Sequence, residues 1–123
     1  MADAGLMITW GENVHGREVR GLEVFNETLE FWGRMQSEGS IESFEVALLQ
    51  SSLPGLAGFI FVRGDDAALS AITSGDEHRR LIIRASMIVQ DVRVTPALIN
   101  EGLARGMAMY QEELAMTPAM SHN

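Results

Sequence analysis

The sequence has no cysteine and no lysine, and its 123 residues include only three prolines and one tyrosine. The lack of cysteine excludes disulfides, thiolate metal sites and a cysteine nucleophile. No apolar run is long enough to cross a membrane, and the N-terminal segment lacks the basic region and apolar core of a signal peptide. We therefore expect a soluble, cytoplasmic protein with no membrane partner.

The net charge of the chain is −8, and all nine basic residues are arginine. A field of this sign repels phosphate backbones, so we expect no nucleic-acid partner. The one dense cluster, Arg79, Arg80 and Arg84, is predicted to be a solvated, salt-paired helix face. Length and a hydrophobic content of 46% indicate a single domain over residues 1–123. Its ordered core is expected over about residues 6–115, with a disordered tail from Met116 onward.

Two switches from strand period to helix period organise the chain. The expected elements are a strand at Leu6–Trp10, a helix at Arg17–Gln36, strands at Ile41–Gln50 and Gly58–Arg63, helical pieces from Asp65 to Arg84 with a break at Ser74-Gly75, and a strand at Met87–Thr95. This β-α-β-β-α-β order predicts an α+β, ferredoxin-like fold, in which helices cover one face of an antiparallel sheet. Thr95-Pro96 then predicts the start of an extra C-terminal helix, with Thr as N-cap and Pro at the first helical position.

Local patterns give further expectations. The first helix should face the sheet through Val19, Leu22, Phe25, Leu29 and Trp32. Ser51 to Gly55 reads as a turn longer than a tight two-residue hairpin loop. Ser74 and Glu77 have the spacing of a capping box. Gly102 and Gly106 stand four residues apart, a spacing that we attribute to chance.

The strands also carry information about assembly. Phe59 and Phe61 point to one side of their strand, and Ile60 and Val62 point to the other. A strand that is apolar on both sides should be central, so the first and third strands are predicted to lie between the second and fourth. Exposed apolar surface of this extent is rare on monomers. The pattern therefore predicts a two-fold homodimer formed through sheet faces.

Four segments carry a resemblance to a known superfamily. They are Ile8-Thr9-Trp10-Gly11, Gly16-Arg17-Glu18, Gly58-Phe59-Ile60 and Ser74-Gly75-Asp76-Glu77-His78-Arg79-Arg80. Over residues 6–95, their arrangement resembles the dimeric α/β barrel superfamily, which includes antibiotic-biosynthesis monooxygenase-like proteins and small proteins of unknown function. The resemblance implies two sheets packed into a barrel across a dimer, with a small-molecule pocket between sheet and helices.

That superfamily contains cofactor-free oxygenases, haem-degrading enzymes and proteins with no known reaction. Its haem-degrading members carry an Asn, a Trp and a His at set places, and the spacing of Asn13, Trp32 and His15 does not match that pattern. We therefore carry over no haem role and predict no cofactor. The histidines form neither an H-x-x-x-H nor an H-E-x-x-H pattern, so no metal site is predicted.

Three titratable residues are candidates for catalysis. His78 heads an inward stripe of the second helical piece and titrates near neutrality, which suits a general base. The alternative is an ordinary first-turn helix histidine at the sheet edge. Glu45 and Asp91 are candidates for carboxylates in a cavity, where burial would raise their pKa values and let one accept a proton. The alternative is that these charges only discourage pairing at the edges of the sheet.

The aromatic residues are the candidate lining of a pocket for a flat apolar ligand. They are Trp10, Trp32, Phe44, Phe59 and Phe61. The alternative is that they form ordinary core. Two functions remain open: a structural or ligand-binding homodimer that takes a small apolar or aromatic molecule, and a cofactor-free monooxygenase-like enzyme for an aromatic or polyketide-like substrate. The sequence does not decide whether the protein is an enzyme.

Overall fold

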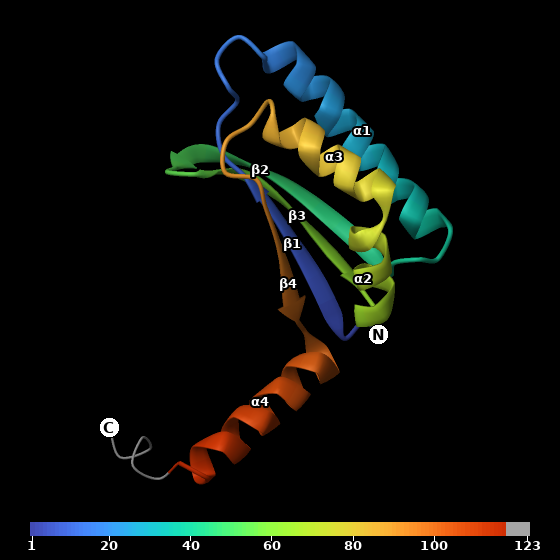
Figure 1. Ribbon diagram of the computed structural model, residues 1–123, viewed down its shortest axis with the longest axis vertical. Helices are drawn as coiled ribbons and strands as arrows, with labels where there is room; N and C mark the ends of the chain where they lie inside the picture. Colours follow the sequence, from blue (N-terminus) through green and yellow to red (C-terminus); the bar gives the residue numbers. More distant parts are fainter. Residues whose placement is uncertain (118–123) are drawn as a thin grey trace.

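A four-stranded antiparallel sheet with helices on one face forms the body of the computed structural model, which describes residues 1–117 (Figure 1). The elements are β1 (Ala4–Trp10), α1 (Glu18–Ser37), β2 (Ser43–Leu53), β3 (Leu56–Gly64), α2 (Asp66–Ser74), α3 (Asp76–Ser86), β4 (Arg93–Leu98) and α4 (Asn100–Ala115). From residue 118 onward, the predicted disordered tail lies outside the described residues.

The strands are ordered β2-β3-β1-β4, so β1 and β3 are central, as their two-sided apolar pattern predicts. Ile8 of β1 pairs with Ile60 of β3 on one side and with Val94 of β4 on the other. All of the pairings are antiparallel. The order and the helices on one face define a ferredoxin-like α+β fold.

The two faces of the sheet have different surroundings. On the face toward α1 and α3, Ile60 and Val62 are 1% and 0% exposed, and they pack in a core with Trp32 and Phe31 of α1. On the opposite face, called the open face from here on, side chains alternate out of the same strands. They include Met7 and Thr9 of β1, Phe59 and Phe61 of β3, and Ala47 of β2. No helix within residues 1–117 covers the open face (Figure 1).

The predicted last strand and C-terminal helix are both present, but their predicted boundaries were wrong. Residues 87–92, expected to open the strand, form a segment that pairs with the loop after β1: Val14 donates to the Ile88 carbonyl, at 2.7 Å, and Gly11 to that of Gln90, at 2.6 Å. The strand instead runs through Thr95-Pro96 to Leu98, and the helix begins at Asn100. Pro96 is tolerated because β4 is an edge strand, where a missing N–H costs no ladder hydrogen bond.

Two local predictions were wrong: the length of the β2–β3 turn and the capping box at the start of α3. The β2–β3 connection is a tight loop, because Leu53 pairs with Leu56 and only Pro54 and Gly55 lie between them. Gly55 has a φ of 75°, a conformation that glycine adopts without a steric cost and that lets this loop be so short. Further along, α3 has Gly75 as its N-cap and no side-chain cap hydrogen bond, so the predicted capping box does not form.

The first helix faces the sheet through a different line of residues at its N-terminal end. Trp32 is fully buried, as the predicted stripe requires, but Val19 and Leu22 are 78% and 61% exposed. Gly21 and Val24 are buried in their place. The reason is the loop after β1, which passes so close that a Cβ on Gly21 would lie 2.9 Å from the Asn13 side-chain oxygen.

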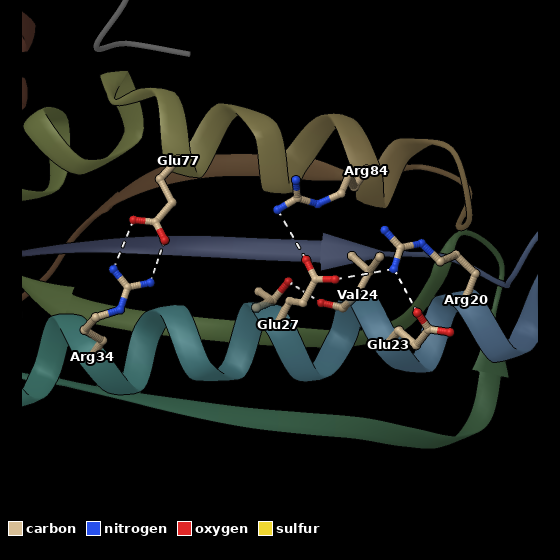
Figure 2. A network of polar contacts seen from close by, with 8 residues as sticks. Arg20, Glu23, Val24, Glu27, Arg34, Glu77 and Arg84 are labelled. Atoms are coloured by element: carbon tan, nitrogen blue, oxygen red, sulfur yellow. Dashed lines mark hydrogen bonds and ion pairs between the residues drawn. The ribbon is translucent and has the colours of Figure 1, made fainter.

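Charged side chains connect α1 to α3 (Figure 2). The two terminal nitrogens of Arg34 bind both oxygens of Glu77, one of them at 3.0 Å, and Arg84 contacts Glu27 at 3.2 Å. The hydrogen bond from Arg34 lowers the pKa of Glu77, and the same contact raises the pKa of Arg34. Exposed pairs of this kind add little stability. They bridge the two helices that cover the sheet.

Candidate functional site

A cavity of about 240 Å³ lies between the sheet and the paired helices α1 and α3. From the sheet, the lining residues are Ile8 and Trp10 of β1, Leu48 of β2 and Ile60 of β3. The helix residues are Glu18, Gly21, Leu22, Val24, Phe25 and Thr28 of α1, and Leu81, Ile82 and Ala85 of α3. Asn13, Ile88, Val89 and Val92, from the segments beside the helices, complete the lining.

The indole of Trp10 is positioned by two neighbours. Its ring meets Phe25 of α1 edge-on, with centroids 5.9 Å apart. On the sheet, it lies across Gly58, where a Cβ would stand 2.7 Å from the ring carbon Cζ2. A side chain at position 58 would therefore displace the Trp10 ring, which is why glycine is needed there. The result is an aromatic surface at the end of β1 that lines the cavity.

The polar groups of the cavity are few. The Thr28 hydroxyl donates to the Val24 carbonyl at 2.8 Å, and a Glu18 oxygen accepts the Gly16 amide at 3.2 Å. Asn13 and Glu18 are exposed, so they lie toward solvent while the deeper walls are apolar. Among the lining residues, Glu18 carries the charge, and it is negative. The cavity therefore suits a neutral, largely apolar molecule better than an anion.

The five aromatic residues predicted to line a pocket are not brought together. Trp10 lines the cavity, whereas Trp32 and Phe44 belong to the core on the helix side of the sheet. Phe59 and Phe61 lie on the open face, since they alternate with the buried Ile60 and Val62. Only Trp10 of this set is in contact with the cavity.

The three titratable candidates are also apart from one another and from the cavity lining. Glu45 lies on the open face, where Arg63 binds it at 2.8 Å and stacks over Phe61, 4.8 Å from the ring centre. Asp91, with a φ of 55°, lies beside the tight turn, and its carboxylate is 3.3 Å from where a Cβ on Gly55 would be. His78 belongs to α3 and lies near Trp32 of α1.

His78 is 4% exposed, which supports the predicted inward stripe of α3. Burial lowers the pKa of His78, and a backbone hydrogen bond to Thr73 opposes this only in part, so the imidazole is neutral at neutral pH. Its ring lies 5.7 Å from the Trp32 indole, centre to centre. Neither His78 Nε2 nor Trp32 Nε1 has a hydrogen-bond partner within residues 1–117. His78 also borders a second, more open hollow of about 470 Å³ between α3 and β4.

Most of the cavity lining is not evident from the sequence. Leu81, Ile82 and Ala85 follow His78 at helical spacing and face inward with it, but this spacing does not reveal that they leave a space. A signal that could have pointed to the site is the interior glycine Gly21, which leaves room for the close approach of another segment. That segment carries Asn13, which is one of the polar lining residues.

The described part of the chain contains neither a cluster of metal-ligating side chains nor a helix that could span a membrane. Among residues 1–117, no group of three or more His, Asp and Glu side chains is close enough to hold a metal ion. None of the helices in this part combines the length and apolar content needed to cross a lipid bilayer.

Comparison with known proteins supports the fold. No protein-family model matches the chain, and no characterised protein matches it in sequence. A solved structure that is similar is that of a dimeric protein of unknown function with a ferredoxin-like fold from Bacteroides fragilis NCTC 9343. The two share 12% sequence identity with a TM-score of 0.59, and the match covers 78% of this chain and 95% of that chain. At this identity the likeness concerns the fold alone.

Proposed function

We propose that the protein is a homodimer that binds a small, neutral, apolar or aromatic molecule in the cavity between the sheet and the helices α1 and α3. The observation that carries this proposal is the cavity itself, about 240 Å³ in volume and lined mainly by aliphatic and aromatic side chains. The cavity opens to solvent where the exposed residues Asn13 and Glu18 line it, while its deeper walls are apolar. A concave, mainly apolar site with a few polar groups at its edge is the usual form of a small-molecule site.

The size and chemistry of the cavity narrow the ligand class. Apolar cavities of about 150 Å³ stay dry and accept benzene. The larger space here suits a molecule of one or two rings, or a short branched chain. Because Glu18 is the charged lining residue, a carboxylate ligand would meet a like charge, whereas a neutral ring would not.

Binding is tested with the neutral fluorescent probe N-phenyl-1-naphthylamine. Ala85 of α3 lines the cavity, so A85F should fill it and weaken binding of the probe at least about tenfold. The matched variant A67F places the same side chain at an exposed position of α2 and should bind as the wild type does. Probe fluorescence, titrated at constant protein concentration, measures both.

Equal affinity of A85F and the wild type would contradict the cavity as the site, and so would the absence of any binding by the wild type. Naphthalene and 1-naphthoate, used as competitors, report on charge. The neutral ring should displace the probe at lower concentration than the anion.

The homodimer has support from two sides. The open face presents Met7, Phe59 and Phe61, which the chain does not cover within residues 1–117. A second copy of the same face is the simplest cover, and it makes a two-fold interface. The Bacteroides fragilis protein of the same fold is described as dimeric.

The dimer is tested by sedimentation and light scattering. Phe59 lies between Ala47 and Thr9 on the open face, so F59D places a charge in the centre of the proposed interface and should yield a monomer. V19D changes an exposed apolar residue of α1, on the other side of the molecule, and should leave the dimer intact. A monomeric wild type at micromolar concentration would remove this part of the proposal.

The second candidate function is a cofactor-free monooxygenase-like reaction on an aromatic or polyketide-like substrate. It is supported by Asn13 and Glu18, the polar groups that join Trp10 around the cavity. Ligand binding does not require these polar groups to take part in a reaction, so ligand binding is the first of the two proposals. Oxygen uptake on addition of such a substrate, lost in A85F, would favour the enzyme.

A further inference from the structure

The C-terminal helix α4 is attached to the body of the protein by its first two turns. The Asn100 side chain donates to the Ala2 carbonyl at 2.7 Å, and Arg105 binds Asp3 at 2.8 Å. Gly102 packs directly on the Asp3 backbone, where a Cβ would approach the carbonyl oxygen to 2.0 Å. The direction of α4 is thus fixed at its start by the N-terminal residues.

Beyond these turns, α4 exposes apolar side chains. Leu103, Met107 and Tyr110 are 49%, 49% and 61% exposed, and with Leu114 they recur at steps of four, three and four residues. This spacing places them on one face of the helix. A helix of 16 residues is marginal by itself, and Gly102 and Gly106 weaken it further. Its distal half needs a packing partner.

The position of α4 indicates where that partner lies. Figure 1 shows α4 leaving the lower end of the sheet and slanting away on the side opposite to α1 and α3. The open face is on that same side. The open face and α4, which carry the uncovered apolar side chains, therefore lie on the same side of the molecule. The 16 residues of α4 span about 24 Å, whereas sheets packed face to face are about 10 Å apart. The helix is long enough to reach past a sheet stacked on the open face.

We propose that α4 packs against a second copy of this chain through Leu103, Met107, Tyr110 and Leu114, extending the interface made by the open faces. Each protomer then holds the other with its own helix. This inference rests on the homodimer proposed above and adds to it the segment that stabilises the pair.

The distribution of charge also supports a second copy of this chain as the partner of α4. The glutamates Glu112 and Glu113 make the distal end of α4 acidic, and its arginine, Arg105, is already paired with Asp3. On the open face, Arg93 of β4 has no ion-pair partner within residues 1–117. A second copy brings an uncompensated cation that suits the acidic helix end.

The test compares two double variants of α4 in the full-length chain. M107D with Y110D places charges on the apolar stripe, and A104D with A108D adds the same charge to exposed positions away from it. The stripe variant should dissociate at a protein concentration at least about tenfold higher than the wild type, and the control should match the wild type. Sedimentation over a dilution series gives the dissociation constants.

Hydrogen exchange supplies a second readout that does not depend on the folding of the stripe variant. Amides of residues 107–115 should be protected in the wild-type dimer and exchange freely in the F59D monomer. A stripe variant that dimerises as tightly as the wild type, or equal exchange in dimer and monomer, would overturn the role of α4 while leaving the homodimer in place. A monomeric wild type would instead remove the homodimer, and with it this inference.

Discussion

Replacing Trp32 with alanine is expected to lower the free energy of unfolding by about 3–5 kcal/mol, the usual cost of deleting a large buried aromatic side chain. Trp32 is 0% exposed and packs edge-on against Phe31, with ring centres 5.0 Å apart, and against His78. Domains have a total stability of about 5–15 kcal/mol, so W32A should be largely unfolded under conditions that leave the wild type folded. Urea unfolding followed by far-ultraviolet circular dichroism measures the difference.

Trp10 provides a matched control, because it is the other tryptophan of the chain. It lines a cavity and is only partly buried, so W10A removes fewer packed contacts and should cost distinctly less than W32A. Equal losses in the two variants would contradict the assignment of Trp32 as the centre of the core. W10A should also weaken binding of the naphthylamine probe.

Trp32 and His78 place two polar nitrogens side by side in the core, with ring centres 5.7 Å apart. Trp32 Nε1 is a donor, and a neutral imidazole has one ring nitrogen that accepts; neither Trp32 Nε1 nor His78 Nε2 has a hydrogen-bond partner within residues 1–117. A donor and an acceptor in the same buried region can share one bridging water. W32F removes the donor and keeps most of the packing, so its smaller cost separates the packing contribution of the ring from that of the N–H.

The layer structure of the fold was predictable because it depends on alternation along single strands. Ile60 and Val62 alternate with Phe59 and Phe61, and this two-sided pattern places β3 in the centre of the sheet whatever its neighbours are. The inward direction of His78 and Leu81 follows in the same way from helical spacing. Periodicity is local, so the sequence alone carries it.

The path from α3 to α4 was not predictable from such patterns. Met87, Ile88 and Val89 have the composition of a strand, yet their backbone pairs with the loop after β1. Composition does not distinguish a strand partner from a loop partner. Thr95-Pro96 likewise has the composition of a helix start, and only the position of β4 at an edge makes it part of a strand.

The candidate site was predictable only in part, since a cavity is the space that side chains leave unfilled. Trp10 was expected to line a pocket, and it does so because Gly58 gives its ring room. The rest of the space depends on the small residues Gly21 and Ala85 and on where the Asn13 loop passes. These features depend on how segments that are distant in sequence pack together, and the residue pattern within one segment does not encode that packing.

Two glycine-to-alanine variants in helices are expected to change stability in opposite directions. Gly33 of α1 has open space within 4 Å of the position that a Cβ would take, so G33A should raise the free energy of unfolding by about 0.5–1 kcal/mol through helix propensity. At Gly102, the new methyl group would stand 2.0 Å from the Asp3 carbonyl oxygen, and backbone cannot yield as a flexible side chain can. G102A should therefore cost about 1–3 kcal/mol, the range for overpacking, despite the better helix former. Urea unfolding of the two variants in parallel tests both signs.

Comparing G33A with G102A also separates the effect of helix propensity from the effect of packing on Asp3. The spacing of Gly102 and Gly106 was attributed to chance, whereas Gly102 packs directly on the Asp3 backbone. If propensity decided, both variants would gain stability, and a gain in G102A would show that α4 is not seated on Asp3. If docking decides, G102A should also release the first turns of α4, since the Asn100 and Arg105 contacts depend on the same seat. The amides of α4 should then exchange faster in G102A than in G33A. The G102A dimer should also dissociate more readily than the G33A dimer, because the direction of α4 is no longer fixed at its start.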